Sequence, residues 1–174
     1  MIAAVSFLAL CGRTIALPRK SGQDGSSGKK VLRFDEFKQL AGEWTGHEMS
    51  GGKPGDAVTV NFKVTAAGSA VVETEFPSGS HEMMTVFTQD GDDVLLTHYC
   101  VMGNQPHMKA PNDGDLKTVA FEFAGASNMK SESSMHMHTA TYTFIDKDTL
   151  RAEWTMHNEN KPTGKVIILV HRKK

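Results

Sequence analysis

The sequence predicts an all-β protein, an antiparallel up-and-down β-barrel with about nine or ten strands and a short N-terminal helix. Two observations lead to this prediction. Apolar and polar residues alternate with a period of two over most of the chain beyond residue 42, and turn-forming residues separate these segments at short, even intervals. Closing such a sheet on itself covers its apolar face and removes exposed edges, so a barrel is favoured over a two-sheet sandwich.

Length and charge exclude several classes of function. The chain has 174 residues, enough for one domain of ordinary size and a tail, and 19 Lys and Arg against 20 Asp and Glu give a formal net charge of -1. This balance gives no electrostatic basis for nucleic acid as the main partner. No apolar run reaches the roughly 18 residues that a membrane span needs. The sequence also lacks a phosphate-binding loop, a dinucleotide fingerprint and the Gly-x-Ser-x-Gly or His-Glu-x-x-His motifs.

The N-terminal segment has the features of a targeting sequence. Residues 1–10 are almost wholly apolar, and Thr14 and Ala16 are small residues at the two positions that an export peptidase recognises. We therefore expect a signal peptide over residues 1–16 and an exported protein, periplasmic or secreted. A lipid anchor on Cys11 is the alternative. Residues 17–30 are rich in Gly and Ser and predict a flexible tether before a single barrel domain over residues 31–174.

The first elements follow from spacing and turn residues. Phe34, Phe37 and Leu40 recur at helical spacing, which predicts one or two helical turns that end at Gly42. The alternation then predicts strands over 43–49, 58–64, 70–76 and 82–88, with turns at 67–69 and 77–80 between the later ones. On the strand 70–76, the pattern places Val72 and Phe76 inside the barrel and Glu73 and Glu75 outside.

The remaining strands are joined by turns rich in Asp and Gly. Residues 89–93 predict a hairpin that leads into a strand over 94–102. Residues 103–115 are expected to form a loop, and Val119, Phe121 and Phe123 then share one face of a strand over 117–123. The last three predicted strands are 135–145, 150–157 and 166–171, the first two of them joined by a turn at 146–148.

Several segments resemble a known group of barrels. Residues 40–46 read Leu-Ala-Gly-Glu-Trp-Thr-Gly and resemble the Gly-x-Trp signature that opens lipocalins and related calycin barrels, in which the Trp closes one end. Residues 68–74, 81–83, 96–100 and 103–106 are similar to bacterial exported, lipocalin-like proteins of unassigned function. This resemblance covers most of residues 40–171 and implies the fold and an exported location, but it carries over no catalytic residue. Haem-binding barrels of the nitrobindin kind are more distant relatives whose motifs are not well matched, so haem is only a minor option.

Three histidines are candidates for an interior site. His136 and His138 are two residues apart on one predicted strand, so they project to the same face, and by apolarity this face is the inner one. His98 shares its face with apolar neighbours and is also expected to point inward. Two histidines at i and i+2 with a third from another strand can build an open metal site that takes zinc, or copper with a Met thioether added. A strand bulge would reverse these facings.

The sequence leaves three functions open. The preferred hypothesis is a barrel whose interior binds a small, mostly apolar molecule, with ligand contacts from seven polar or thiol side chains: His98, Cys100, Asn104, Gln105, His136, His138 and Tyr142. The first alternative is a zinc- or copper-dependent enzyme or metal carrier, and the second is a scaffold for another protein. No catalytic residue is assigned, no cofactor is firmly expected, and the oligomeric state is not indicated.

Overall fold

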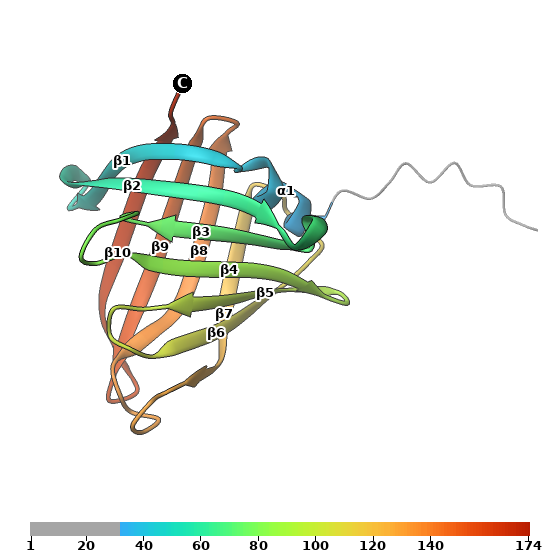
Figure 1. Ribbon diagram of the computed structural model, residues 1–174. Helices are drawn as coiled ribbons and strands as arrows, with labels where there is room; N and C mark the ends of the chain where they lie inside the picture. Colours follow the sequence, from blue (N-terminus) through green and yellow to red (C-terminus); the bar gives the residue numbers. More distant parts are fainter. Residues whose placement is uncertain (1–31) are drawn as a thin grey trace, which may run out of the picture. The chain divides into compact units, whose positions relative to one another are not determined.

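A computed structural model describes residues 32–174, which form one helix and a closed barrel of ten antiparallel strands (Figure 1). The predicted antiparallel up-and-down barrel is therefore confirmed. The signal peptide and the tether predicted for residues 1–16 and 17–30 lie outside the described residues. Within the described part of the chain, no helix is long and apolar enough to span a membrane.

Each strand pairs with the next along the chain, and β1 pairs with β10 to close the barrel, with Thr45 opposite His171. A 3-10 turn, η1 (Ala66–Gly68), joins β2 to β3. The elements are α1 (Arg33–Gln39), β1 (Gly42–Ser50), β2 (Lys53–Thr65), β3 (Ala70–Glu75), β4 (Met83–Asp90), β5 (Asp93–Tyr99), β6 (Gln105–Pro111), β7 (Thr118–Ser127), β8 (His136–Asp146), β9 (Thr149–Asn158) and β10 (Lys161–Arg172).

One strand lies where the sequence predicted a loop. β6 occupies part of residues 103–115, and within it Met108 and Ala110 are buried while Lys109 is exposed. The alternation is thus present in the sequence, but it is short and has Pro106 and Pro111 near its ends. Proline is depleted in strands because it donates no ladder hydrogen bond. The two prolines therefore led to the prediction of a loop over residues 103–115.

Helix α1 fills one end of the barrel with an aromatic side chain. The ring of Phe37 is fully buried and stacks on that of Phe87, with ring centroids 4.3 Å apart. The rings of Phe121 and Tyr142 contact Phe37 edge-on at 5.8 and 5.4 Å. The helix is held in place by the backbone N–H of Phe34, which donates to Asn112 Oδ1 on the β6–β7 connection at 3.0 Å. The interior at the helix end is therefore solid aromatic core.

The Gly-x-Trp segment packs between this helix and the end of the last strand, β10. Trp44 is fully buried, and its indole N–H donates to the carbonyl of Leu40 at 2.8 Å. The guanidinium of Arg172 lies 4.4 Å from the centre of the Trp44 ring and donates to the carbonyls of Ala41 and Gln39 at 2.8 and 2.7 Å. Arg172 thus carries a cation–π contact and two carbonyl contacts at once, which a lysine could not reproduce.

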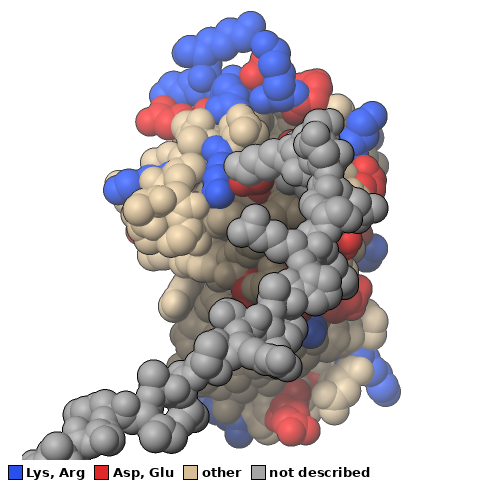
Figure 2. Space-filling view, turned by 90° about the vertical axis from the view of Figure 1, so that its right-hand side faces the viewer, with Lys and Arg blue, Asp and Glu red and all other residues tan. Residues whose placement is uncertain are grey.

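Charge on the surface is mixed rather than concentrated. Figure 2 shows one face, on which Lys and Arg gather at the top of the view and acidic and basic side chains alternate below. Figure 1 places the C-terminus at the top, where β10 ends at Arg172 and Lys173 and Lys174 follow it. Part of this positive charge is neutralised locally, since Lys173 Nζ lies 2.8 Å from Glu43 Oε2. This face therefore presents no extended field of one sign.

Replacing Phe37 with Ala should destabilise the barrel by about 3–5 kcal/mol, because it removes the ring around which the helix-end core packs. Gln39→Ala, in the same helix but exposed, should change the free energy of unfolding by less than about 0.5 kcal/mol. Urea denaturation of both variants measures the difference. A loss below about 1 kcal/mol for Phe37→Ala would contradict the assignment of Phe37 as the central packing residue.

Candidate functional site

Two glutamates of β3 face the barrel interior, although the sequence pattern placed them outside. Glu73 and Glu75 are 2% and 3% exposed. The register explains the error: Glu75 is paired with Val60 and Glu73 with Phe62, and both partners are buried core residues of β2. Directly opposed residues share a face, so the neighbouring strand, rather than the apolar content of β3 itself, determines where the carboxyls point.

A chain of hydrogen bonds runs across the interior from Glu73 to His98. Tyr142 donates its hydroxyl proton to Glu73 Oε2 at 2.6 Å, so the Tyr142 oxygen accepts from the Thr85 hydroxyl. The Thr85 oxygen in turn accepts from His98 Nδ1, which lies 2.9 Å away. With the chain running in this direction, the His98 proton is on Nδ1, and Nε2 has a free lone pair.

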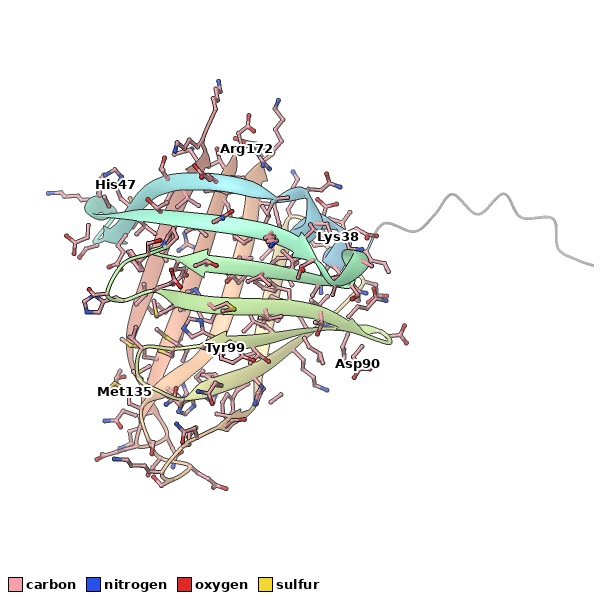
Figure 3. All side chains as sticks on the ribbon, viewed as in Figure 1. Lys38, His47, Asp90, Tyr99, Met135 and Arg172 are labelled. Carbon is pink, nitrogen blue, oxygen red and sulfur yellow. The ribbon has the colours of Figure 1, made fainter. Side chains whose placement is uncertain are left out.

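This lone pair faces a small cavity at the end of the barrel opposite α1, the end at which Figure 3 places His47. The cavity has a volume of about 80 Å³. Among residues 32–174, His98 Nε2 and Glu75 Oε1 are buried atoms with no hydrogen-bond partner, and both side chains line the cavity. The other lining residues are mostly apolar, namely Glu48, Phe76, Met83, Met137, Trp154, Val166 and Ile168.

Burial sets the protonation states in this cavity. It lowers the pKa of His98 to about 4, so the imidazole is neutral at pH 7. Burial, and secondarily the charge of Glu48, raises the pKa of Glu75 to about 7. The pKa of Glu73 is raised well above its usual range by burial and by Glu75, and the hydrogen bond from Tyr142 opposes this shift. A neutral imidazole and a carboxyl near its titration point therefore face the same small space.

The histidines of β8 lie in a different place from His98. The expectation that all three share the interior is wrong, because β8 has a bulge between Met137 and Thr139. Met137 lines the cavity of His98, whereas His136 and His138 line a separate hollow. The predicted three-histidine metal site is therefore not assembled. Within the described part of the chain, no group of three or more His, Cys, Asp or Glu side chains is arranged to hold a metal ion.

The separate hollow, of about 700 Å³, lies beside the point where the β7–β8 pairing ends, at Phe121 opposite Ala140. His136 donates from Nδ1 to the carbonyl of Ser134 at 2.7 Å, and its Nε2 lies 3.0 Å from His138 Nδ1. The ring of His138 is stacked on that of His157, with centroids 3.7 Å apart. Partial burial, followed by the charges of His157 and His136, lowers the pKa of His138.

The remaining predicted contact residues do not line the cavity of His98. Asn104 donates from Nδ2 to the carbonyl of Met135 at 2.8 Å, and Gln105 donates to that of Gly103 at 3.1 Å, so both amides fasten loops. Cys100 is a buried free thiol, and burial raises the pKa of that thiol. Tyr142 does not line the cavity and is connected to it through Thr85 and His98.

Comparison with known proteins adds evidence on the fold. No known protein family matches the sequence, and no curated protein matches it. The structure is similar to the crystal structure of Rv2717c from M. tuberculosis, with a TM-score of 0.60 and 14% identity over 82% of this chain and 98% of that one. It is also similar to a protein of unknown function from the DUF3598 family of Nostoc punctiforme, with a TM-score of 0.51 and 14% identity.

The second similarity covers 78% of this chain and 48% of the Nostoc protein, so the chain spans about half the length of that relative. The structural similarity to these two proteins is evidence for a shared barrel fold. Because both are only 14% identical to this chain, the similarity does not extend to site residues or function. The site residues must therefore be interpreted from their own geometry.

Replacing Glu75 with Gln should change the pH dependence of stability. Because the folded protein holds the Glu75 proton up to about pH 7, against an ordinary pKa of 4.5, the free energy of unfolding contributed by this group falls as pH rises through that range. Glu75→Gln should therefore become more stable relative to wild type between pH 4.5 and 8, by up to about 3 kcal/mol. His98 is present in both proteins, so its opposite contribution cancels.

Urea denaturation at a series of pH values measures this difference, with Glu122→Gln as the matched control at an exposed position. A difference between Glu75→Gln and wild type that stays constant from pH 4.5 to pH 8 would show that the Glu75 carboxyl titrates normally.

Proposed function

We propose that the protein binds a small, mostly apolar molecule in the cavity lined by His98 and Glu75. The observation that carries this proposal is the pair of buried polar atoms, His98 Nε2 and Glu75 Oε1, which lack hydrogen-bond partners among residues 32–174 and share one cavity with apolar walls. Small-molecule sites have this composition, with a few placed polar groups on a largely apolar surface.

Energetics support a binding role for these two atoms. A buried polar atom without a partner costs about 1–3 kcal/mol, so two of them in one cavity reduce stability appreciably. A ligand that supplies the missing hydrogen bonds recovers much of this energy in the bound state. The chain through Thr85 and Tyr142 also holds the His98 ring in one tautomer and orientation. The site is therefore organised before the ligand arrives.

The size of the cavity limits what enters it. A volume of about 80 Å³ is well below the roughly 300–1,000 Å³ of pockets that enclose a drug-sized molecule. Phe76 and Met83 line both the cavity and a neighbouring surface hollow of about 460 Å³. We therefore propose that the polar end of the ligand occupies the cavity and that its apolar remainder lies across Phe76 and Met83.

We also propose that the chain belongs to the exported, lipocalin-like bacterial proteins that its sequence resembles, and that it acts outside the cytoplasm. The barrel and the packing of Trp44 under Arg172 support the lipocalin-like part of this proposal. The apolar character of residues 1–10, with small residues at 14 and 16, supports export.

Titration with six-carbon probes that differ in their head group tests the binding function. We expect at least one of 1-hexanol, hexylamine, hexanoate and hexanamide to shift the indole N–H signal of Trp154, which lines the cavity, in a ¹H–¹⁵N NMR spectrum. The indole signal of Trp44 should stay unchanged, because Trp44 is buried in the helix-end core and its N–H is bonded to Leu40.

Two matched variants complete this test. Val166→Phe places a larger side chain at a cavity-lining position and should abolish the shift, whereas Ile167→Phe, which does not line this cavity, should preserve it. The proposal fails if none of the four probes shifts the Trp154 signal and Val166→Phe is as stable as wild type or more so. The cavity would then hold only water or empty space.

A further inference from the structure

Three carboxyl side chains lie close together at the end of the barrel opposite α1, and none of them has a basic partner among residues 32–174. Glu48 and Glu75 line the cavity, and Glu73 lies behind them on the same strand as Glu75. Each is close enough to influence the next, since Glu48 acts electrostatically on Glu75 and Glu75 on Glu73. No Lys or Arg lines the cavity, and no ion pair found within residues 32–174 includes any of the three.

The hydrogen-bonding groups in the cavity require a donor from the ligand. His98 Nε2 is an acceptor when the ring proton is on Nδ1, the tautomer that matches the chain from Tyr142 through Thr85. Glu75 Oε1 is an acceptor whenever the carboxyl is ionised. An ammonium group has three N–H donors and no acceptor, so it can satisfy both atoms and supply the missing positive charge. A carboxylate ligand would face like charge and could satisfy neither atom.

The cavity walls fit such a group. A volume of about 80 Å³ is several times the roughly 10–15 Å³ that a cavity needs, in the same measure, to hold one water. It therefore accommodates an ammonium head and the first carbons of a chain. Trp154 and Phe76 line the same space, and aromatic rings attract cations that approach their faces. Asp56 and Glu48 line the adjoining surface hollow and extend the acidic character to the entrance.

We infer that the ligand of this site is a small primary amine with an apolar chain, bound as its ammonium ion with N–H groups directed to Glu75 Oε1 and His98 Nε2. This inference rests on the proposed binding function and names the chemical class of its ligand. The apolar chain leaves the cavity over Phe76 and Met83, as the proposed site requires.

Matched probes of equal chain length test the charge requirement. At pH 7.5, hexylamine should bind at least tenfold more tightly than 1-hexanol, and hexanoate should bind most weakly, as measured from the Trp154 indole signal. Glu75→Gln should weaken hexylamine at least tenfold and change the affinity for 1-hexanol less than threefold. Glu122→Gln, at an exposed position on β7, should leave both affinities unchanged.

The pH dependence provides a second readout. Hexylamine stays protonated below pH 8, as a lysine side chain with its pKa near 10.4 does. Its affinity should fall as the pH is lowered from 8 to 5.5, because a proton on Glu75 competes with the ligand. His98 stays neutral over this range. The other ionisable groups that face or back the site are Glu48, Glu73, Cys100 and Tyr142, with Asp56 and His81 in the adjoining hollow.

The outcomes separate the two claims. If 1-hexanol or hexanoate binds at Trp154 as tightly as hexylamine, or if Glu75→Gln leaves the affinity for hexylamine unchanged, the amine inference is wrong and the binding function stands. If no probe shifts the Trp154 signal and Val166→Phe costs no stability, the binding function fails and the inference fails with it.

Discussion

The packing of Phe37 determines how the interior of this barrel is divided. A ten-strand barrel encloses more space than its strands' own side chains fill at the helix end, and the ring of Phe37 enters that space from α1 to stack on Phe87. Side chains pack closely at this end of the barrel. The small cavity lies at the opposite end, where Figure 1 shows β3 ending and β4 beginning, so the helix and the cavity occupy opposite ends of the interior.

At the end of the barrel opposite α1, buried polar groups take the place of the close aromatic packing found at the helix end. Burial penalises their charged forms, which keeps His98 neutral and raises the pKa of Glu75. The hydrogen-bond chain through Tyr142 and Thr85 satisfies the inner groups and leaves one atom free at its outer end, His98 Nε2. A polar network that is complete on one side and open on the other is the arrangement expected of a binding site rather than of a core.

Much of the fold could be predicted from the sequence, but less of the site. Alternation and turns predicted the barrel, and His98 lies on the inner face where the alternation placed it. The register of β3 could not be predicted, because Glu73 and Glu75 face inward only through their pairing with β2. The bulge at Met137 likewise has no local signal, and it moves His136 and His138 away from His98. Cross-strand register and bulges depend on partners distant in sequence, which period-two patterns do not describe.

The measurement that tests this account most directly is the ¹⁵N NMR spectrum of the His98 imidazole between pH 4 and pH 8. The hydrogen-bond chain predicts a neutral ring with its proton on Nδ1 and an unprotonated Nε2, retained down to about pH 4. A ring that is protonated on Nε2, or that becomes an imidazolium near pH 6.5, would contradict the chain. His98 Nε2 would then no longer be the free acceptor on which the proposed binding site depends.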